Sequence, residues 1–306
     1  MRDTFIKALT ALAEKDSRIM LITSDVGFGV LTNFAERFPN QFLNVGVAEQ
    51  NMTGVATGMA LENRIVFTYS IANFPTLRCL EQIRNDAAYH DVNVKIVSIG
   101  GGFSYGALGM SHHATEDIAI MRALPIKVMV PGTLWEVEQA TKALIDISGT
   151  CYLRLDKSHA GNVDYQDKTF VFGKACRIKD GNDITLIAAG GILADVIEAA
   201  EILAQQGIQC RVVSMHTINP IDEDEIISAA KETGGIVTVE EHTVHGGLGG
   251  AIAEISLESG VLPRKFYRIG LRDGFSMIVG SQTHLKKVYN MDVTAIVTKV
   301  KSILGK

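Results

Sequence analysis

Short apolar runs rich in β-branched residues alternate along this chain with longer segments of helical periodicity, and this alternation predicts an α/β fold. The first series places strands at residues 19–24, 42–45, 65–69, 94–99, 127–130 and 151–155, with helices near 2–15, 49–62, 76–90, 115–123 and 134–147. The second places strands at 184–188, 209–214, 236–240 and 266–269, with helices near 192–206, 222–233, 248–259, 281–289 and 292–304. Apolar strands separated by helices are typical of mostly parallel sheets with helices on both faces.

A polar stretch without periodicity separates the two series. It covers residues 156–168 and contains the turn formers Gly161 and Asn162. We therefore expect two doubly wound domains, residues 1–160 and a smaller one at 171–306, joined by a linker at 161–170. The 306 residues are 47% hydrophobic, which is enough apolar material for two cores.

Charge, hydropathy and cysteine usage exclude several classes of protein. The net charge is −5 and no long basic run occurs, so no nucleic-acid partner is expected. Charges interrupt the N-terminal segment, which predicts an amphipathic helix and not a signal peptide. The most apolar run, residues 184–193, is too short to span a bilayer, so no membrane association is expected. Four cysteines without CxxC spacing argue against disulfides or a zinc site and favour a cytoplasmic location.

The first chemically informative stretch is residues 44–52, with the sequence NVGVAEQNM. A strand ends there, a glycine turn follows, and a helix begins at about Glu49. A glutamate at a helix start is usually explained by the helix dipole. This one lies in an apolar or neutral segment at the carboxyl end of a parallel strand, where α/β sheets bind ligands, so Glu49 is a candidate functional carboxylate. Gly54 and Gly58, four residues apart on the same helix, would let another backbone approach closely.

Two glycine-rich stretches follow. Residues 100–113 form a loop with five glycines, which is typical of backbone close to a ligand or of simple mobility. Its last residues, His112 and His113, are adjacent, so their side chains point apart and no metal site is expected. Residues 237–250 read as strand, glycine turn and helix. Because Ile252 stands where a GxGxxG fingerprint needs glycine, we interpret them as a tight turn packed at an interface.

Four segments, taken in order, resemble the transketolase family. They are VGVAEQNM (45–52), EQIRND (81–86), GMSHHATEDIAIMRALP (109–125) and VTVEEHTVHGGLGGAIAE (237–254). The resemblance covers essentially the whole chain. It implies a thiamine diphosphate pyrimidine-binding domain at 1–160 and a transketolase C-terminal-like domain at 171–306. The GDG motif and the asparagines with which this family binds the diphosphate and its magnesium have no counterpart here.

The resemblance therefore implies one subunit of a split transketolase. Such an enzyme moves a two-carbon ketol unit from a ketose phosphate, or a related anionic ketose, to an aldose. It implies thiamine diphosphate as cofactor, with Mg²⁺ bound through a partner subunit that carries the diphosphate-binding domain. It also implies self-association of this chain into a dimer within a two-plus-two heterotetramer.

The resemblance assigns cofactor roles residue by residue. Glu49 matches the glutamate that hydrogen-bonds the aminopyrimidine ring and helps the cofactor to lose its acidic proton. In a dry interface desolvation favours a protonated carboxyl group, which suits that task. Phe74 matches the phenylalanine that stacks on the pyrimidine if one residue is deleted near Ser70; without this gap Pro75 takes the place.

The remaining roles concern the sugar. His112 matches a catalytic histidine that contacts the cofactor and the reacting end of the substrate. Arg2 matches an arginine that binds the substrate phosphate. Lys157 stands where a second such arginine is expected, and it keeps the charge but loses the bidentate fork. No metal ligand is expected in this chain.

Three departures from the family pattern fall at the sugar end of the site. Gly29 stands at the position of a serine of the phosphate pocket. Gly100 replaces a phosphate-binding histidine, and Leu108 replaces an aspartate that reads a sugar hydroxyl. These changes leave the cofactor chemistry intact. They favour an unusual ketose over xylulose 5-phosphate: branched, deoxygenated or carrying a different anionic group.

Three alternatives remain at this stage. The β subunit of a 2-oxo acid dehydrogenase shares the two-domain layout and the glutamate, but the segment SHHATEDIAIMRALP favours the transketolase side. Deoxyxylulose phosphate synthase normally carries both halves in one chain. A non-catalytic interaction subunit has no physical need for a costly buried carboxyl group, so the presence of Glu49 and His112 argues against it.

Overall fold

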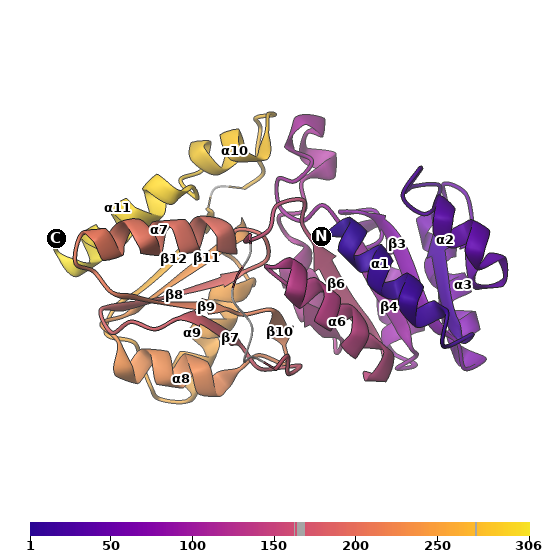
Figure 1. The fold of residues 1–306 in the computed structure, drawn as a ribbon, viewed down its shortest axis with the longest axis horizontal. Coiled ribbons are helices and arrows are strands. Elements are labelled where there is room, and N and C mark those ends of the chain that lie inside the picture. The colour runs from indigo at the N-terminus through magenta and orange to yellow at the C-terminus, as the bar shows by residue number, and fades with distance from the viewer. Residues whose placement is uncertain (162, 164–168, 273) are drawn as a thin grey trace.

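The computed structural model describes residues 1–161, 163, 169–272 and 274–306. Two sheets lie side by side, each with helices on both faces (Figure 1). The expected α/β class with mostly parallel sheets is confirmed. The expected linker at 161–170 includes residues 162 and 164–168, which lie outside the described residues.

The first sheet has seven strands in the order β10-β5-β6-β4-β3-β1-β2, and all pairs are parallel except β10 with β5. Residues at the same level of neighbouring strands are both apolar, as with Leu21 and Phe67 of β1 and β3. The strands are β1 (Ile19–Thr23), β2 (Phe42–Asn44), β3 (Ile65–Ile71), β4 (Val94–Ile99), β5 (Lys127–Met129), β6 (Cys151–Leu155) and β10 (Thr217–Asn219).

Alternate residues of each strand point to opposite faces of this sheet, and a separate core forms on each. On one face Leu21 packs with Phe5 of α1. On the other face Ile22 packs with Met52 of α3. The first core involves α1 (Arg2–Ala13), α2 (Thr32–Arg37) and α6 (Leu134–Asp146). The second involves α3 (Glu49–Leu61) and α5 (Asp117–Arg122).

The single helix expected at 76–90 is divided into three short pieces. They are the 3₁₀ turn η2 (Leu77–Cys79), the single turn α4 (Leu80–Gln82) and the π-helical segment η3 (Ile83–Ala88). The π segment contacts α3 and includes most of the EQIRND motif. Such segments are rare and often occur near functional sites.

The second sheet has five strands in the order β12-β11-β8-β9-β7, and only β7 runs antiparallel to its neighbour. The strands are β7 (Cys176–Lys179), β8 (Ile184–Ala189), β9 (Cys210–Ser214), β11 (Ile236–Thr243) and β12 (Phe266–Leu271). Figure 1 places α7 (Leu193–Gln205), α10 (Gln282–Val288) and α11 (Val293–Leu304) on one side of it, with α8 (Glu223–Glu232) and α9 (Leu248–Glu258) on the other.

The two halves of the chain are packed into each other. Strand β10 is preceded and followed by elements of the second half, yet it pairs with β5 at the edge of the first sheet (Figure 1). A single apolar cluster joins Ile118 and Met121 of the first half to Ile218 and Leu248 of the second. In the described part of the chain no helix is long and apolar enough to cross a membrane.

Candidate active site

The sequence-predicted site residues come mainly from loops that follow the carboxyl ends of strands of the first sheet. Glu49 follows β2, Phe74 follows β3, His112 lies in the loop after β4, and Lys157 follows β6. Parallel strands of one sheet end at a common edge, so these loops meet there. Only Arg2, at the start of α1, comes from an element that does not follow a strand.

Glu49 is the first residue of α3, and its side chain is 4% exposed. Its carboxylate accepts a hydrogen bond from Nη1 of Arg78 at 2.7 Å. The N-cap residue of α3, Ala48, offers no side-chain cap, and no hydrogen bond joins the Glu49 carboxylate to the described backbone of α3. A salt bridge with Arg78 therefore accompanies whatever the helix dipole contributes. Sequence reasoning missed Arg78.

A continuous series of contacts links Glu49 to the predicted histidine. The guanidinium carbon of Arg78 lies 4.4 Å from the centre of the Phe74 ring. That ring meets the imidazole of His112 edge-on, with 5.1 Å between centroids. Asn73, beside Phe74, donates to the backbone oxygen of His113 at 2.8 Å and so ties this segment to the histidine loop.

The two adjacent histidines have different environments. His112 is half-buried and lies within hydrogen-bond distance of the Ser111 hydroxyl. Burial and the neighbouring His113 lower the pKa of His112, so its imidazole is neutral at neutral pH. His113 is buried, packs edge-on against Phe103 and lies 3.1 Å from the Gly106 carbonyl oxygen. Only His112 therefore faces the site.

Tyr105 extends the site beyond His112 towards Lys157. Its ring centroid lies 6.4 Å from that of His112, and the Lys157 ammonium lies 4.1 Å from the ring centre. The ring fills the space beside Gly100, where an added Cβ would lie only 2.1 Å from a ring carbon. The glycine at this family histidine position is thus a steric requirement of Tyr105, another residue that sequence reasoning missed.

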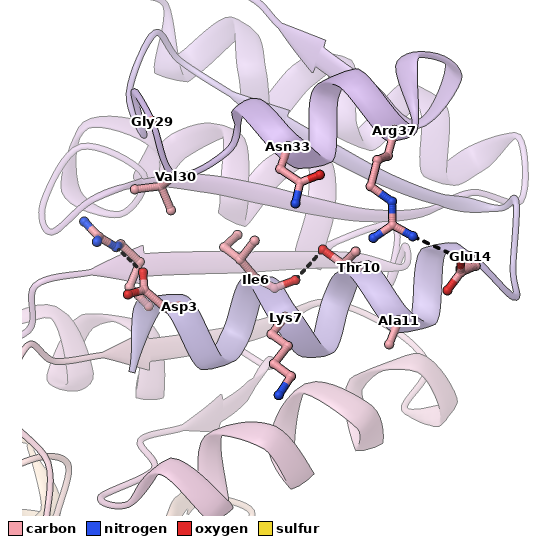
Figure 2. Close-up of a pocket in the computed structure, with 11 residues that line it drawn as sticks. Asp3, Ile6, Lys7, Thr10, Ala11, Glu14, Gly29, Val30, Asn33 and Arg37 are labelled. Atoms are coloured by element: carbon pink, nitrogen blue, oxygen red, sulfur yellow. Dashed lines mark hydrogen bonds and ion pairs between the residues drawn. The ribbon is translucent and has the colours of Figure 1, made fainter.

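Arg2 pairs with Asp3 at 2.9 Å and lines a groove between α1 and α2 (Figure 2). Gly29 lines the same groove, so the structure brings together two positions assigned to the substrate phosphate. The Arg37–Glu14 ion pair lies further along the two helices.

Arg2 is also electrostatically linked to the Tyr105 region. Burial raises the pKa of Tyr105, and the Arg2 charge opposes that rise, so the phenol stays protonated at neutral pH next to two cations. Leu108, by contrast, is an exposed residue of the turn that follows Tyr105. The sugar end of the site therefore presents Arg2, Lys157 and a phenol, with an apolar side chain near its rim.

The donor set fits one end of thiamine diphosphate and not the other. A buried carboxylate beside an aromatic ring suits an aminopyrimidine, which needs a proton partner and a stacking surface. In the described residues no cluster of three or more His, Cys, Asp or Glu side chains could hold a metal ion. The cofactor's pyrimidine end would meet Glu49 and Phe74, and its metal-bound end would have to be held elsewhere.

Comparisons with known proteins point to one family. Residues 1–162 match the model of the transketolase pyrimidine binding domain, and residues 173–296 match that of the transketolase C-terminal domain. One of the two subunits of an apulose-4-phosphate transketolase of Phocaeicola vulgatus is 37% identical over 96% of this chain and 94% of its own length. A 6-deoxy-6-sulfo-D-fructose transketolase subunit of a Clostridium species is 36% identical over 97% of this chain and 92% of its own.

A solved structure agrees with these relatives. The structure of a split-gene transketolase, an inactive β4 tetramer, superposes with a TM-score of 0.90 at 35% identity. The match covers 99% of this chain and 98% of that chain.

Proposed function

Because this chain belongs to the transketolase family, we propose that it is the C-terminal subunit of a split, thiamine diphosphate-dependent transketolase. The reaction is transfer of a two-carbon ketol unit from an anionic ketose to an aldose. The observation that carries the proposal is the contact series Glu49–Arg78–Phe74–His112 at the carboxyl edge of the first sheet.

The cofactor, when bound, supplies an electron sink for the carbanion of the transferred unit. Glu49 holds a proton at a nitrogen of the pyrimidine ring, and its burial keeps water from competing for that proton. Phe74 provides the apolar surface on which the ring stacks. Arg78 neutralises Glu49 in the lone chain, and it has to share or release the carboxylate when the ring arrives.

His112 acts at the sugar. A neutral imidazole can accept a proton from a substrate hydroxyl or donate one to a developing oxyanion, and the lowered pKa of His112 keeps this form available. The edge of Phe74 fixes the ring on one side, and Tyr105 lies on the other. His112 would therefore approach the reacting end of the sugar from a fixed direction.

The anionic end of the substrate is proposed to lie near Arg2, Lys157 and the hydroxyl of Tyr105. Two cations and a neutral donor suit a phosphate or a sulfonate, since both present three oxygens to hydrogen-bond donors. Two relatives are named for apulose 4-phosphate and 6-deoxy-6-sulfo-D-fructose, and the second name describes a deoxygenated, sulfonated sugar. These names support an unusual ketose for this chain as well.

Catalysis is proposed to need a partner subunit that carries the diphosphate-binding domain and its Mg²⁺. The solved relative is inactive as a β4 tetramer, which supports dependence on another subunit. The outer face of α3 is open for contact: Gly54 and Gly58 are exposed, and no atom lies within 4 Å of a Cβ built on either. We place two copies of this chain and two of the partner in the assembly. Four free thiols agree with a cytoplasmic location.

The decisive experiment is reconstitution with the neighbouring gene product, followed by assay of ketol transfer. A panel of phosphorylated and sulfonated ketoses identifies the donor, and 2-oxo acids test the dehydrogenase alternative, which the transketolase relatives do not favour. Ketol transfer by the mixture and by neither chain alone is expected. Oxidative decarboxylation of a 2-oxo acid, or full activity of this chain alone, would overturn the proposal.

A further inference from the structure

The loop that carries His112 and Tyr105 is closed at its base by a short backbone pairing. Gly102 and Ala114 exchange two hydrogen bonds of 2.8 and 2.9 Å, so residues 103–113 form a closed excursion between them. Within it lie only two 3₁₀ turns, η4 (Gly106–Leu108) and η5 (Met110–His112). So little regular structure does not by itself fix side chains to the accuracy that catalysis requires.

The second half of the chain supplies the missing support. The backbone N–H of Phe103 donates to Oε1 of Glu241 at 2.5 Å. The N–H of Gly280 donates to the Gly106 oxygen at 3.2 Å. The Phe103 ring stacks on Tyr289, with centroids 5.5 Å apart and planes inclined by 20°. All three contacts cross from the second sheet's elements to this loop.

Glu241 is the central contact of this set. It is buried at the end of β11, and Nε2 of Gln282 donates to both of its carboxylate oxygens, at 3.1 and 3.0 Å. Gly102 has a φ of +59°, and an added Cβ there would lie 2.6 Å from Oε1 of Glu241. The loop thus lies directly against the carboxylate, and no side chain fits at residue 102.

The backbone of Glu241 also contributes. Nη2 of the buried Arg154 donates to the backbone oxygen of Glu241 at 3.0 Å and to that of Ala114 at 3.2 Å. One guanidinium therefore joins β11 to the far end of the loop, while the Glu241 side chain holds its near end. Both ends are bound to the same residue of the second domain.

We infer that Glu241 is a positioning residue of the active site, which holds the 103–113 loop so that His112 stays beside Phe74 and Tyr105 beside Lys157. The C-terminal domain then takes part in catalysis as well as in assembly. A charged acceptor suits this task, because a hydrogen bond from N–H to carboxylate is roughly twice as strong as one to a neutral oxygen. The catalytic consequence rests on the proposed function, whereas the ordering of the loop does not.

The test compares Glu241→Ala with the matched control Glu240→Ala. Glu240 is also buried and also accepts two backbone N–H groups, those of Leu248 and Gly249, at 2.7 and 2.9 Å. Those bonds cap α9 and do not reach the loop. Hydrogen exchange of peptides covering 103–113 is measured in the full chain together with the melting temperature. Both variants should melt lower, but only Glu241→Ala should speed exchange in the loop.

The reconstituted enzyme gives the second readout. We expect Glu241→Ala to lower kcat by about ten- to a hundredfold, since small misplacements of catalytic groups cost that much, while the KM of thiamine diphosphate changes little. Glu241→Gln keeps an acceptor for the Phe103 N–H and should restore most of the loss. If Glu240→Ala and Glu241→Ala changed loop exchange and kcat equally, Glu241 would be only a stabilising residue of the interface.

A milder variant covers the case in which Glu241→Ala does not fold. Gln282→Leu removes the amide that orients the Glu241 carboxylate and leaves the interdomain core unchanged. It should speed loop exchange to a smaller extent, and unchanged exchange would overturn the inference. If exchange responds as expected but no variant or wild type transfers ketol units, the proposed function fails and the loop-ordering role of Glu241 stands.

Discussion

The ion pair between Glu49 and Arg78 should respond very unequally to removal of its two partners. The Glu49 side chain is 4% exposed and that of Arg78 is 45% exposed, with 2.7 Å between Oε2 and Nη1. Arg78→Met leaves a buried carboxylate without its counter-ion but keeps an apolar stem over Phe74. Glu49→Gln leaves a guanidinium that is already nearly half in water.

The magnitudes follow from this difference in burial. Breaking a fully buried pair costs about 3–5 kcal/mol, whereas an exposed pair contributes about 0–1 kcal/mol. With one partner half-exposed, we expect Arg78→Met to lower the free energy of unfolding by about 2 kcal/mol. Glu49→Gln removes the costly buried charge along with the pair, so it should stay within about 1 kcal/mol of the wild type. The double variant should then be more stable than Arg78→Met alone.

Urea unfolding of the four proteins measures these differences, and the double-mutant cycle isolates the coupling between the two side chains. In the reconstituted enzyme Glu49→Gln should lose about two to four orders of magnitude in turnover, as expected for lost acid–base assistance. If Glu49 only complements the dipole of α3, Glu49→Gln costs up to about 1 kcal/mol and leaves turnover intact. That result, or a double variant less stable than either single one, would refute the reasoning.

Four further outcomes are expected. The isolated chain should bind thiamine diphosphate weakly or not at all in calorimetry, and tight magnesium-dependent binding would contradict the split-enzyme proposal. Light scattering should detect at least a dimer of this chain, and a monomer with or without the partner would count against the assembly. Burial and the charge of Asp156 raise the pKa of Glu241 from 4.5 to about 7, while Arg154 and Lys286 oppose the rise. The folded state therefore binds this proton more tightly than the unfolded state, so relative to Glu241→Gln the wild type should lose up to about 3 kcal/mol of stability between pH 4.5 and 7, and parallel pH profiles in urea unfolding would contradict this. Tyr105→Phe should raise KM for the anionic ketose about tenfold, as expected for one lost hydrogen bond to a charged group, and leave cofactor binding unchanged; an unchanged KM would remove Tyr105 from the substrate site.

Apolar periodicity predicted most of the helices and strands, because those elements are long and strongly patterned. It missed β10, whose three residues Thr217–Asn219 form a strand only because β5 offers a free edge. It also missed β7, an edge strand with no fully buried residue. Both owe their structure to neighbours distant in sequence, which local propensity does not register. The tight glycine turn at 246–250 was expected at an interface, and Gly246 does pack against Ala119 of the first half.

The candidate site was accessible from the sequence in part. Glu49, Phe74 and His112 follow strands or lie in family motifs, and the structure brings all three together. Arg78 and Tyr105 carry no motif. Their roles arise from three-dimensional contacts, one with a carboxylate 29 residues away and the other with the space left by Gly100. A glycine at a position where the family has a large side chain was the available signal, because another side chain has to fill that space.

The packing between the two domains explains why they share one polypeptide. A first domain cut off at about residue 160 would lose β10 from the edge of its sheet and expose Ile118 and Met121, which are buried against α8 and α9. Arg154 would lose its bond to the Glu241 oxygen, and its pairs with Asp117 and Asp156 would border water. Unpaired buried groups and exposed apolar surface both oppose folding of such a piece. The surface of α3, in contrast, has open space above Gly54 and Gly58 and needs no covalent neighbour. A transketolase can therefore be divided where the pyrimidine-binding domain meets the diphosphate-binding domain, but not between the two domains of this chain.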